Sequence, residues 1–393
     1  MSKIIPYGKQ SISEEDIQAV VNVLRSDYLT QGNVVPAFEK AVTEYCGSKY
    51  GVAVNSATSA LHIACIALGV KEGDYVWTSP ITFVASANCA LYCGAKVDFV
   101  DIDPHTFNMS VQALEEKLNE AKLKGLLPKV VIPVALCGQS CDMEGIFELS
   151  KKFGFKIIED ASHAIGGKYK GRPVGSCFYS DITIFSFHPV KIITTCEGGM
   201  AVTNNIELYG KLQRLRSHGI TRNAWEMTNP PDGPWFYQQL ELGYNYRMTD
   251  VQAALGISQL QRINSFVKKR HDLAKLYDKL LSNNSDFEIP WRSEDAYSAF
   301  HLYVIRVTSV NTVGRLTIFE RLRSNGILVN VHYIPVYRHP YYSVLGYDPL
   351  DFPVSEKYYH EAITLPIFPG LTEKQIEGIV EILKSPLNYQ TIF

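Results

Sequence analysis

Lys191 lies in a largely apolar stretch, which predicts that its side chain is shielded from solvent. The run FSFHPVKIITTCEGG, residues 185–199, begins as an apolar strand, turns at His188 and Pro189, and continues with β-branched residues and a glycine pair. Most lysines are solvated surface residues, and that is the alternative reading of Lys191. An amine held away from water has a lowered pKa, and the neutral amine is the form that attacks a carbonyl to make a Schiff base. Lys191 is therefore a candidate catalytic residue.

An anion site is indicated where a helix directly follows an apolar run. In NSATSALHIACIAL, residues 55–68, the helix begins at about Ala57. The free N–H groups and partial positive charge of a helix start attract anions, and the hydroxyls of Thr58 and Ser59 can add hydrogen bonds. An ordinary N-cap is the alternative. Ser186 closes a second apolar run, DITIFSF, and offers another hydroxyl to an anion at the same sheet edge.

A carboxylate, an imidazole and an aromatic ring complete the set of candidates. Asp160 closes the apolar run KIIEDA, where it could pair with a cationic nitrogen of a ligand or cap the next turn. His163 could serve a ligand or be a structural imidazole, and Phe83 could stack on a ligand or belong to the core. An anion cup, a carboxylate for a ring nitrogen, an aromatic face and a Schiff-base lysine together are what pyridoxal 5′-phosphate (PLP) requires. The set is more specific than any of its members.

The elements that must position these residues follow an α/β pattern. Continuous apolar strands separated by helices indicate a mostly parallel seven-stranded sheet covered on both faces. Ligands of such sheets bind beyond the carboxyl ends of the strands. The seven expected strands are YGVAVN, DYVWTS, KVDFVDID, KVVIPVAL, KIIEDA, DITIFSF and GMAVTN, and helical patterns lie at 57–68, 81–93, 110–124 and 142–153.

The pattern also divides the chain into two parts. Residues 1–261 are expected to form a large domain with an N-terminal helix, whose start is marked by the capping-box spacing of Ser13 and Asp16. From residue 262 on, a long helix, two strands and two further helices indicate a small α+β domain, residues 262–393. The run EMTNPPDGPWF, residues 226–236, has no periodicity and predicts a long exposed loop.

The composition and the absence of several motifs limit the functions that the sequence is compatible with. The 393 residues are 46% apolar and 20% charged with a net charge of −2, so we expect a soluble, cytoplasmic protein without nucleic acid or membrane partners. No early apolar run resembles a signal peptide, and no stretch approaches the ~20 apolar residues of a membrane span. The eight cysteines never form a CxxC pair, so we expect reduced thiols and no metal site. Dinucleotide, P-loop, zinc-protease and serine-hydrolase fingerprints are missing as well.

Taken together, the motifs resemble those of the DegT/StrS family of PLP-dependent nucleotide-sugar aminotransferases. They occur in order over nearly the whole chain as YLTQG, NSATSALH, TFVASAN, EDASHAIG, FSFHPVKIITTCEGG, RSHGI, LGYNYRMTDVQAALG and VHYIPVY. The resemblance implies the aspartate-aminotransferase fold (PLP fold type I). SHAIG, RSHGI and NVHYIPVY are most similar to the branch that serves pseudaminic acid biosynthesis. That branch implies transfer of an amino group from L-glutamate to C4 of a UDP-linked 4-keto-6-deoxy-2-acetamido sugar.

The resemblance also implies a role for each candidate residue. Lys191 would form the Schiff base with PLP and then carry protons as the general base. Asp160 would form a salt bridge to the pyridine nitrogen, and His163, where many relatives have glutamine, would lie near the ring hydroxyl. Phe83 would stack on the ring. The implied phosphate ligands are Thr58, Ser59, Ser186 and Asn245.

Two further expectations concern the partner subunit and the sugar. In the family, the asparagine that matches Asn245 reaches the phosphate from the neighbouring subunit, so a homodimer with a shared active site would be the minimal active unit. The implied contacts with the sugar nucleotide are Tyr7, Asp27, Tyr28, Leu29, Thr30, Ala57, Ser186, His188, Asn245, Asn330, Val331, His332 and Tyr333.

Three alternatives remain open at this point. A transaminase of the same family could act on a different nucleotide-linked keto sugar, because specificity depends on loops. A related dehydratase is less consistent with the sequence, because those relatives replace the lysine with histidine, whereas Lys191 is present here. A non-catalytic regulatory protein on the same scaffold would have no need of the lysine, the aspartate and the anion cup together.

Overall fold

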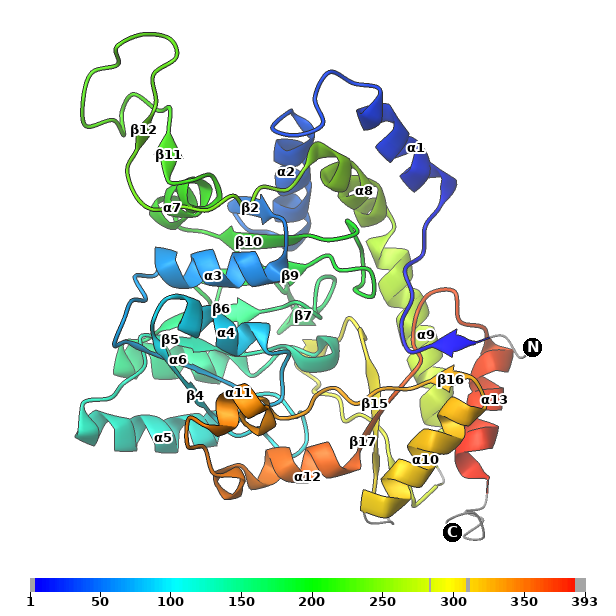
Figure 1. Cartoon of the computed structure of the whole chain (residues 1–393). Coiled ribbons are helices and arrows are strands. Elements are labelled where there is room, and N and C mark those ends of the chain that lie inside the picture. Colours follow the sequence, from blue (N-terminus) through cyan, green and yellow to red (C-terminus); the bar gives the residue numbers. More distant parts are fainter. Residues whose placement is uncertain (1–3, 283, 309–311, 386–393) are drawn as a thin grey trace.

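A seven-stranded sheet lies at the centre of the protein, and its strands are the seven that the sequence predicts (Figure 1). The computed structural model describes residues 4–282, 284–308 and 312–385. The strand order is β2-β10-β9-β6-β5-β3-β4. In chain order the strands are β2 (Tyr50–Val54), β3 (Tyr75–Thr78), β4 (Lys96–Phe99), β5 (Val130–Ile132), β6 (Lys156–Asp160), β9 (Ile182–Ser186) and β10 (Gly199–Thr203).

Strand β10 is the exception to the parallel arrangement. It runs antiparallel to both of its neighbours, β2 and β9, and the remaining pairs are parallel, which confirms a mostly parallel sheet. The register pairs Gly199 of β10 with Val54 on one side and with Ser186 on the other. Asp160 pairs with Ile184 of β9. The carboxyl ends of β2, β6 and β9 and the first residue of β10 therefore meet at one edge.

Helices cover both faces of this sheet, as the sequence predicts. Residues of α3, α4 and α7 share one hydrophobic core with side chains from one face of the sheet. Residues of α2 and α8, and separately of α5 and α6, pack on the other face. The bounds are α2 (Val34–Cys46), α3 (Ala57–Ala67), α4 (Ala85–Tyr92), α5 (Val111–Lys124), α6 (Met143–Phe153), α7 (Ile206–Arg216) and α8 (Asp250–Gln261).

The C-terminal part contains a smaller antiparallel sheet with helices against it, which confirms the predicted α+β character. Its three strands are ordered β13-β15-β17, and they share a hydrophobic core with three helices. The elements are α9 (Ile263–Leu281), β13 (Phe287–Glu288), β15 (Tyr303–Val307), α10 (Thr312–Ser324), β17 (Ala362–Leu365) and α13 (Glu373–Lys384).

The N-terminal segment connects the two parts. Strand β1 (Ile5–Pro6) pairs in parallel with β16 (Ile327–Leu328), and the chain then leads to α1 (Glu14–Leu24) beside α8. The division between residues 1–261 and 262–393 stays a prediction. The remaining elements are β7 (Lys168–Tyr169), β8 (Arg172–Pro173), β14 (Ala296–Tyr297), α11 (Pro340–Ser343), α12 (Pro353–Glu361) and 3-10 helices at Leu136–Gly138, Val336–Arg338 and Pro349–Asp351.

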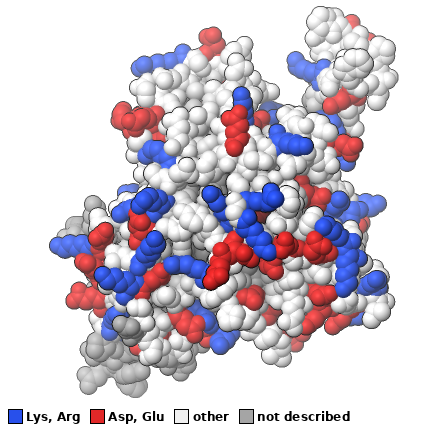
Figure 2. Space-filling view, turned by 180° about the vertical axis from the view of Figure 1, so that it is seen from behind, with Lys and Arg blue, Asp and Glu red and all other residues white. Residues whose placement is uncertain are grey.

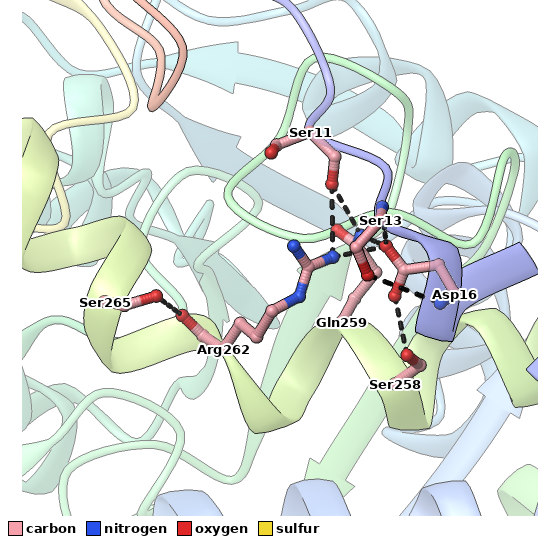
Figure 3. A network of polar contacts seen from close by, with 7 residues as sticks. All are labelled: Ser11, Ser13, Asp16, Ser258, Gln259, Arg262 and Ser265. Carbon is pink, nitrogen blue, oxygen red and sulfur yellow. Dashed lines mark hydrogen bonds and ion pairs between the residues drawn. The ribbon is translucent and has the colours of Figure 1, made fainter.

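A buried polar cluster holds helix α1 against α8 (Figure 3). Ser13 and Asp16 form the predicted capping box. The carboxylate of Asp16 is fully buried, accepts hydrogen bonds from Ser258 and from Gln259, both at 2.6 Å, and pairs with Arg262. The cluster therefore ties the first helix to the end of α8.

Residues 226–236 contain no helix or strand and project from the body as the predicted exposed loop (Figure 1). The loop lies between β11 (Ile220–Thr221) and β12 (Gln238–Gln239), which pair antiparallel. Elsewhere the surface is mixed in charge, and Figure 2 shows basic and acidic side chains interspersed over one face. Within the described part of the chain, no helix is long and apolar enough to cross a membrane.

Candidate functional site

A cavity of about 720 Å³ lies at the sheet edge where β2, β6 and β9 end. Its walls come from both parts of the chain, because residues 330–334 and His339 face the large sheet across it. The structure brings most of the predicted site residues into this cavity. Those that line it are Tyr7, Ala57, Thr58, Phe83, Asp160, His163, Ser186, His188, Lys191, Asn330, Val331, His332 and Tyr333.

Lys191 reaches the cavity from a tight turn after β9. Its backbone N–H donates to the carbonyl of His188 at 2.9 Å, which brings the chain back toward the end of the strand. Burial lowers the pKa of the Lys191 amine to about 8, although the negative charge of Asp160 opposes this shift. It is the only lysine among the described residues that line the cavity. A substantial fraction of this amine is therefore neutral near physiological pH.

Asp160 presents a buried carboxylate to the same cavity. Only 4% of the residue is exposed. Its Oδ1 accepts hydrogen bonds from the Ser162 N–H at 3.1 Å and hydroxyl at 2.6 Å, and its Oδ2 accepts one from the Ser86 hydroxyl at 2.7 Å. No Lys, Arg or His among the described residues forms an ion pair with it within 4.0 Å. A buried carboxylate that faces a cavity without a counter-ion suits a cationic ligand atom.

His163 lines the same cavity as Asp160 and is also buried. Its Nε2 is 3.2 Å from the hydroxyl of Tyr333, whereas its Nδ1 has no hydrogen-bond partner among the described residues. Burial holds the pKa of His163 well below its usual value, and electrostatic interactions with Lys191 and His332 lower it further. The imidazole is therefore neutral.

The start of helix α3 lies at the cavity, where the anion site is predicted, and it adds one residue that the sequence analysis missed. Ser56 is the N-cap, its hydroxyl accepts the N–H of Ser59 at 3.1 Å, and it lines the cavity beside Ala57 and Thr58. The Ser59 hydroxyl instead donates to the Asn55 side chain at 2.7 Å and does not line the cavity. The signal for Ser56 was its place one residue before the predicted helix.

Gly199 allows the first turn of α3 to lie close to strand β10. A Cβ at this position would overlap the backbone of Ser56 and Ala57. Only a glycine therefore lets β10 pass beneath the helix start at this distance, where Ser56, Ala57 and Thr58 line the cavity.

Phe83 is an exposed aromatic residue at the wall of the cavity. Its exposed fraction is 59%, which excludes the alternative that it belongs to the core. Its ring centroid lies 6.3 Å from that of Tyr333. The two rings face the same cavity from different parts of the chain, so a flat ligand could lie against Phe83.

On the predicted sugar side, Tyr7 and His332 form a pair whose ring centroids are 5.0 Å apart. The Nδ1 of His332 lies 2.9 Å from the Thr364 hydroxyl, and burial lowers the pKa of His332 to about 3. His188 lies at the mouth, with its Nε2 4.0 Å from the carboxylate of Glu197, another lining residue that the sequence analysis did not single out.

Two predicted groups lie outside the cavity of this chain. Residues 27–30 are exposed in the connection between α1 and α2, where the carbonyl of Leu29 accepts the N–H of Asp250 at 3.0 Å. Asn245 is exposed and forms an isolated bridge with Ser217. Their participation in the site stays a prediction, and Asn245 was expected to act on a neighbouring subunit.

Known proteins match the chain over nearly its whole length. The DegT/DnrJ/EryC1/StrS aminotransferase family matches residues 10–384. A relative from Campylobacter jejuni, named UDP-4-amino-4,6-dideoxy-N-acetyl-β-L-altrosamine transaminase, is 38% identical over 390 residues, which cover 98% of each chain.

Two solved structures have the same fold. One is Helicobacter pylori PseC, described as an aminotransferase involved in the biosynthesis of pseudoaminic acid, with a TM-score of 0.88, 32% identity and coverage of 97% of this chain and 98% of that one. The other is the putative sugar aminotransferase Spr1654 from Streptococcus pneumoniae in its PLP form, with a TM-score of 0.87, 32% identity and the same coverage.

Proposed function

Because the chain belongs to the DegT/DnrJ/EryC1/StrS aminotransferase family, we propose that it is a PLP-dependent transaminase of nucleotide sugars. It moves an amino group from L-glutamate to C4 of a UDP-linked 4-keto-6-deoxy-2-acetamido sugar. The product is UDP-4-amino-4,6-dideoxy-N-acetyl-β-L-altrosamine, the sugar in the name of the Campylobacter jejuni relative. The observation that carries this function is the presence of Lys191 and Asp160 in one buried cavity.

The residues of the cavity fit the cofactor. Asp160 would hold the cationic ring nitrogen, since it is a buried carboxylate without a counter-ion in the described part of the chain. The start of α3 with Thr58, joined by Ser186, would hold the phosphate. Phe83 would cover one face of the ring, and His163 would lie near the ring hydroxyl. When bound, PLP supplies the electron-withdrawing ring that stabilises a carbanion.

A side chain of the protein, Lys191, carries out the proton transfers. With a pKa of about 8, the Lys191 Nζ is present in both its neutral and its charged form near neutral pH. It can therefore take a proton from the Cα of L-glutamate and deliver one to C4 of the sugar, which is general acid–base catalysis by one group. Asp160, Tyr333 and His332 line the same cavity around this amine.

A homodimer is the proposed active form. Asn245 and residues 27–30 are exposed and outside the cavity of their own chain, which supports a role on the neighbouring subunit. Within the cavity, Tyr7 and residues 330–333 would contact the sugar nucleotide. Because its substrates are a nucleotide sugar and an amino acid, we place the enzyme in the cytoplasm.

The test is transamination by the purified protein loaded with PLP. L-Glutamate is added with each member of a panel of UDP-linked 4-keto sugars, and the products are analysed by NMR. We expect an amino group at C4 of the L-altro product and one equivalent of 2-oxoglutarate. A preference for another keto sugar would overturn the proposed substrate. Failure to transfer an amino group to any sugar would favour the non-catalytic alternative.

A further inference from the structure

A chain of buried hydroxyl groups ends on the carboxylate of Asp160. The Thr82 Oγ1 lies 2.8 Å from the Ser86 Oγ, and the Ser86 hydroxyl donates to Asp160 Oδ2 at 2.7 Å. Thr82 is 2% exposed and Ser86 is 1% exposed, so neither hydroxyl has water as a ready substitute. Ser86 lies in the first turn of α4, three positions after Phe83. The helix that begins beside Phe83 therefore also reaches Asp160.

The direction of the hydrogen bonds in this chain follows from the carboxylate. An ionised carboxylate only accepts, so the single hydroxyl hydrogen of Ser86 must point to Oδ2. The Thr82 hydroxyl must then be the donor to Ser86. Successive hydrogen bonds of this kind polarise one another, which strengthens the last one.

The two oxygens of Asp160 are not equivalent. Each can accept about two hydrogen bonds. Oδ1 accepts two from Ser162, through its N–H and its hydroxyl, whereas Oδ2 accepts only the one from Ser86. An acceptor position is therefore left at Oδ2, on a residue that lines the cavity.

We propose that Ser86, supported by Thr82, is a positioning residue that fixes the Asp160 carboxylate so that Oδ2 accepts the N–H of the PLP ring nitrogen. This inference rests on the proposed function. Ser162 prevents rotation of the carboxylate from the other side. The hydroxyl bonds also stabilise the ionised form of Asp160, which keeps the shared proton on the ring nitrogen rather than on the carboxylate.

Removal of the Ser86 hydroxyl should therefore shift the proton toward Asp160. In Ser86→Ala, we expect the ¹⁵N NMR signal of ring-labelled PLP bound to the full-length protein to move toward that of neutral pyridine. Affinity for PLP should fall about tenfold, as expected for one charge-assisted hydrogen bond. Thr82→Val should change both readouts in the same direction but less. Ser86→Thr keeps the hydroxyl, so its ¹⁵N signal and its affinity for PLP should stay close to those of the wild type.

Ser79→Ala is the matched control, because Ser79 is also a buried serine, 1% exposed, but its hydroxyl has no hydrogen-bond partner among the described residues. It should leave both readouts unchanged. A PLP analogue with carbon in place of the ring nitrogen separates positioning from packing, since the affinity loss in Ser86→Ala should largely disappear with it. If Ser86→Ala does not fold, as judged by thermal melting, Thr82→Val carries the test.

An unchanged ¹⁵N signal in the folded variants, or an equal loss of affinity for PLP and for the analogue, would overturn the role of Ser86. Those outcomes leave PLP binding by the wild type intact. If the wild-type protein does not bind PLP at all, the proposed function is overturned and the inference with it, so the two failures are distinguishable.

Discussion

The amine of Lys191 and the carboxylate of Asp160 face one cavity, and the charge of Asp160 acts on the pKa of Lys191. Burial alone would lower that pKa further, and the nearby negative charge limits the shift, so the pKa remains at about 8. The pair thus keeps a reactive amine that can still carry a proton. Asp160 is the last residue of β6 and Lys191 follows the end of β9, at the same edge of the sheet.

Lys191→Ala should abolish transamination. The variant lacks the amine that we propose bonds to the cofactor and acts as the general base, so we expect turnover to fall by at least about 10³-fold. Borohydride reduction followed by mass spectrometry should find no PLP on the peptide around residue 191. Lys40→Ala, at a solvent-exposed ion pair with Glu44, is the control and should retain full activity. Unchanged turnover in Lys191→Ala would contradict the assigned mechanism.

Protonation of Lys191 should also affect stability. Its pKa changes from 10.5 in the unfolded chain to about 8 in the folded protein, so the unfolded state binds more protons between these values. The free energy of unfolding of the cofactor-free protein should therefore increase as the pH rises across this window. That increase is lost again as the pH falls through 8. Each pKa unit corresponds to about 1.4 kcal/mol.

Lys191→Met removes this titration and should be more stable than the wild type at pH 7, by up to about 3 kcal/mol. The difference should shrink by pH 10. Urea unfolding of both cofactor-free proteins at the two pH values measures it, and the other titrating groups cancel in the comparison. A difference that does not depend on pH would show that the Lys191 amine is well solvated.

Gly199→Ala should weaken the proposed phosphate site at the start of α3. The added Cβ would overlap the backbone at Ser56 and Ala57, so the helix start must move away from the cavity. We expect the affinity for PLP to fall by about tenfold to a hundredfold, as measured by fluorescence titration. The control is Gly378→Ala in α13, where an added Cβ meets nothing within 4 Å. That change should be neutral or slightly stabilising.

Much of this site could be predicted because the ends of the strands can be recognised in the sequence. Continuous apolar runs marked all seven strands of the sheet, and the carboxyl ends of parallel strands share an edge, so Asp160 and Ser186 were expected together. Lys191 was recognisable from the turn that follows β9. The antiparallel direction of β10 was not predicted, because strand direction depends on the connection rather than on the apolar pattern.

The hydroxyl partners could not be predicted in the same way. Ser86 and Asp160 are 74 positions apart in the sequence, and a serine in a helix start has many ordinary roles. The hydrogen bond that the Ser59 hydroxyl donates to the Asn55 side chain likewise depends on side-chain geometry. Residues 27–30 and Asn245 lie outside the cavity of their own chain, so a single chain does not test their predicted roles.

Asp16→Ala should destabilise the protein strongly. The change removes the fully buried acceptor for Ser258 and Gln259 and leaves Arg262 without its ion-pair partner (Figure 3). Loss of one partner from such a cluster costs about 3–5 kcal/mol. Urea unfolding measures the loss, and Asp272→Ala, at an exposed ion pair with Lys268, should cost well under about 1 kcal/mol. Equal effects of the two changes would contradict the role of burial.

Tyr333→Phe should remove the contact between the Tyr333 hydroxyl and the His163 imidazole, and thereby destabilise the protein. The variant removes the hydroxyl that lies 3.2 Å from Nε2, and both nitrogens of a buried imidazole would then have no hydrogen-bond partner among the described residues. An unsatisfied buried nitrogen costs about 1–3 kcal/mol. We therefore expect lower stability of the cofactor-free protein in urea unfolding.

A double-mutant cycle with His163→Gln separates this contact from the general effect of each change. If the hydroxyl and the imidazole are hydrogen-bonded, the second change should cost about 1 kcal/mol less once the first has been made. Because burial holds the pKa of His163 well below its usual value, the coupling should not vary between pH 6 and 8, roughly the range over which an unperturbed histidine titrates. Additive effects of the two changes would rule out the hydrogen bond. A coupling that varies across this pH range would show that the imidazole takes up a proton there.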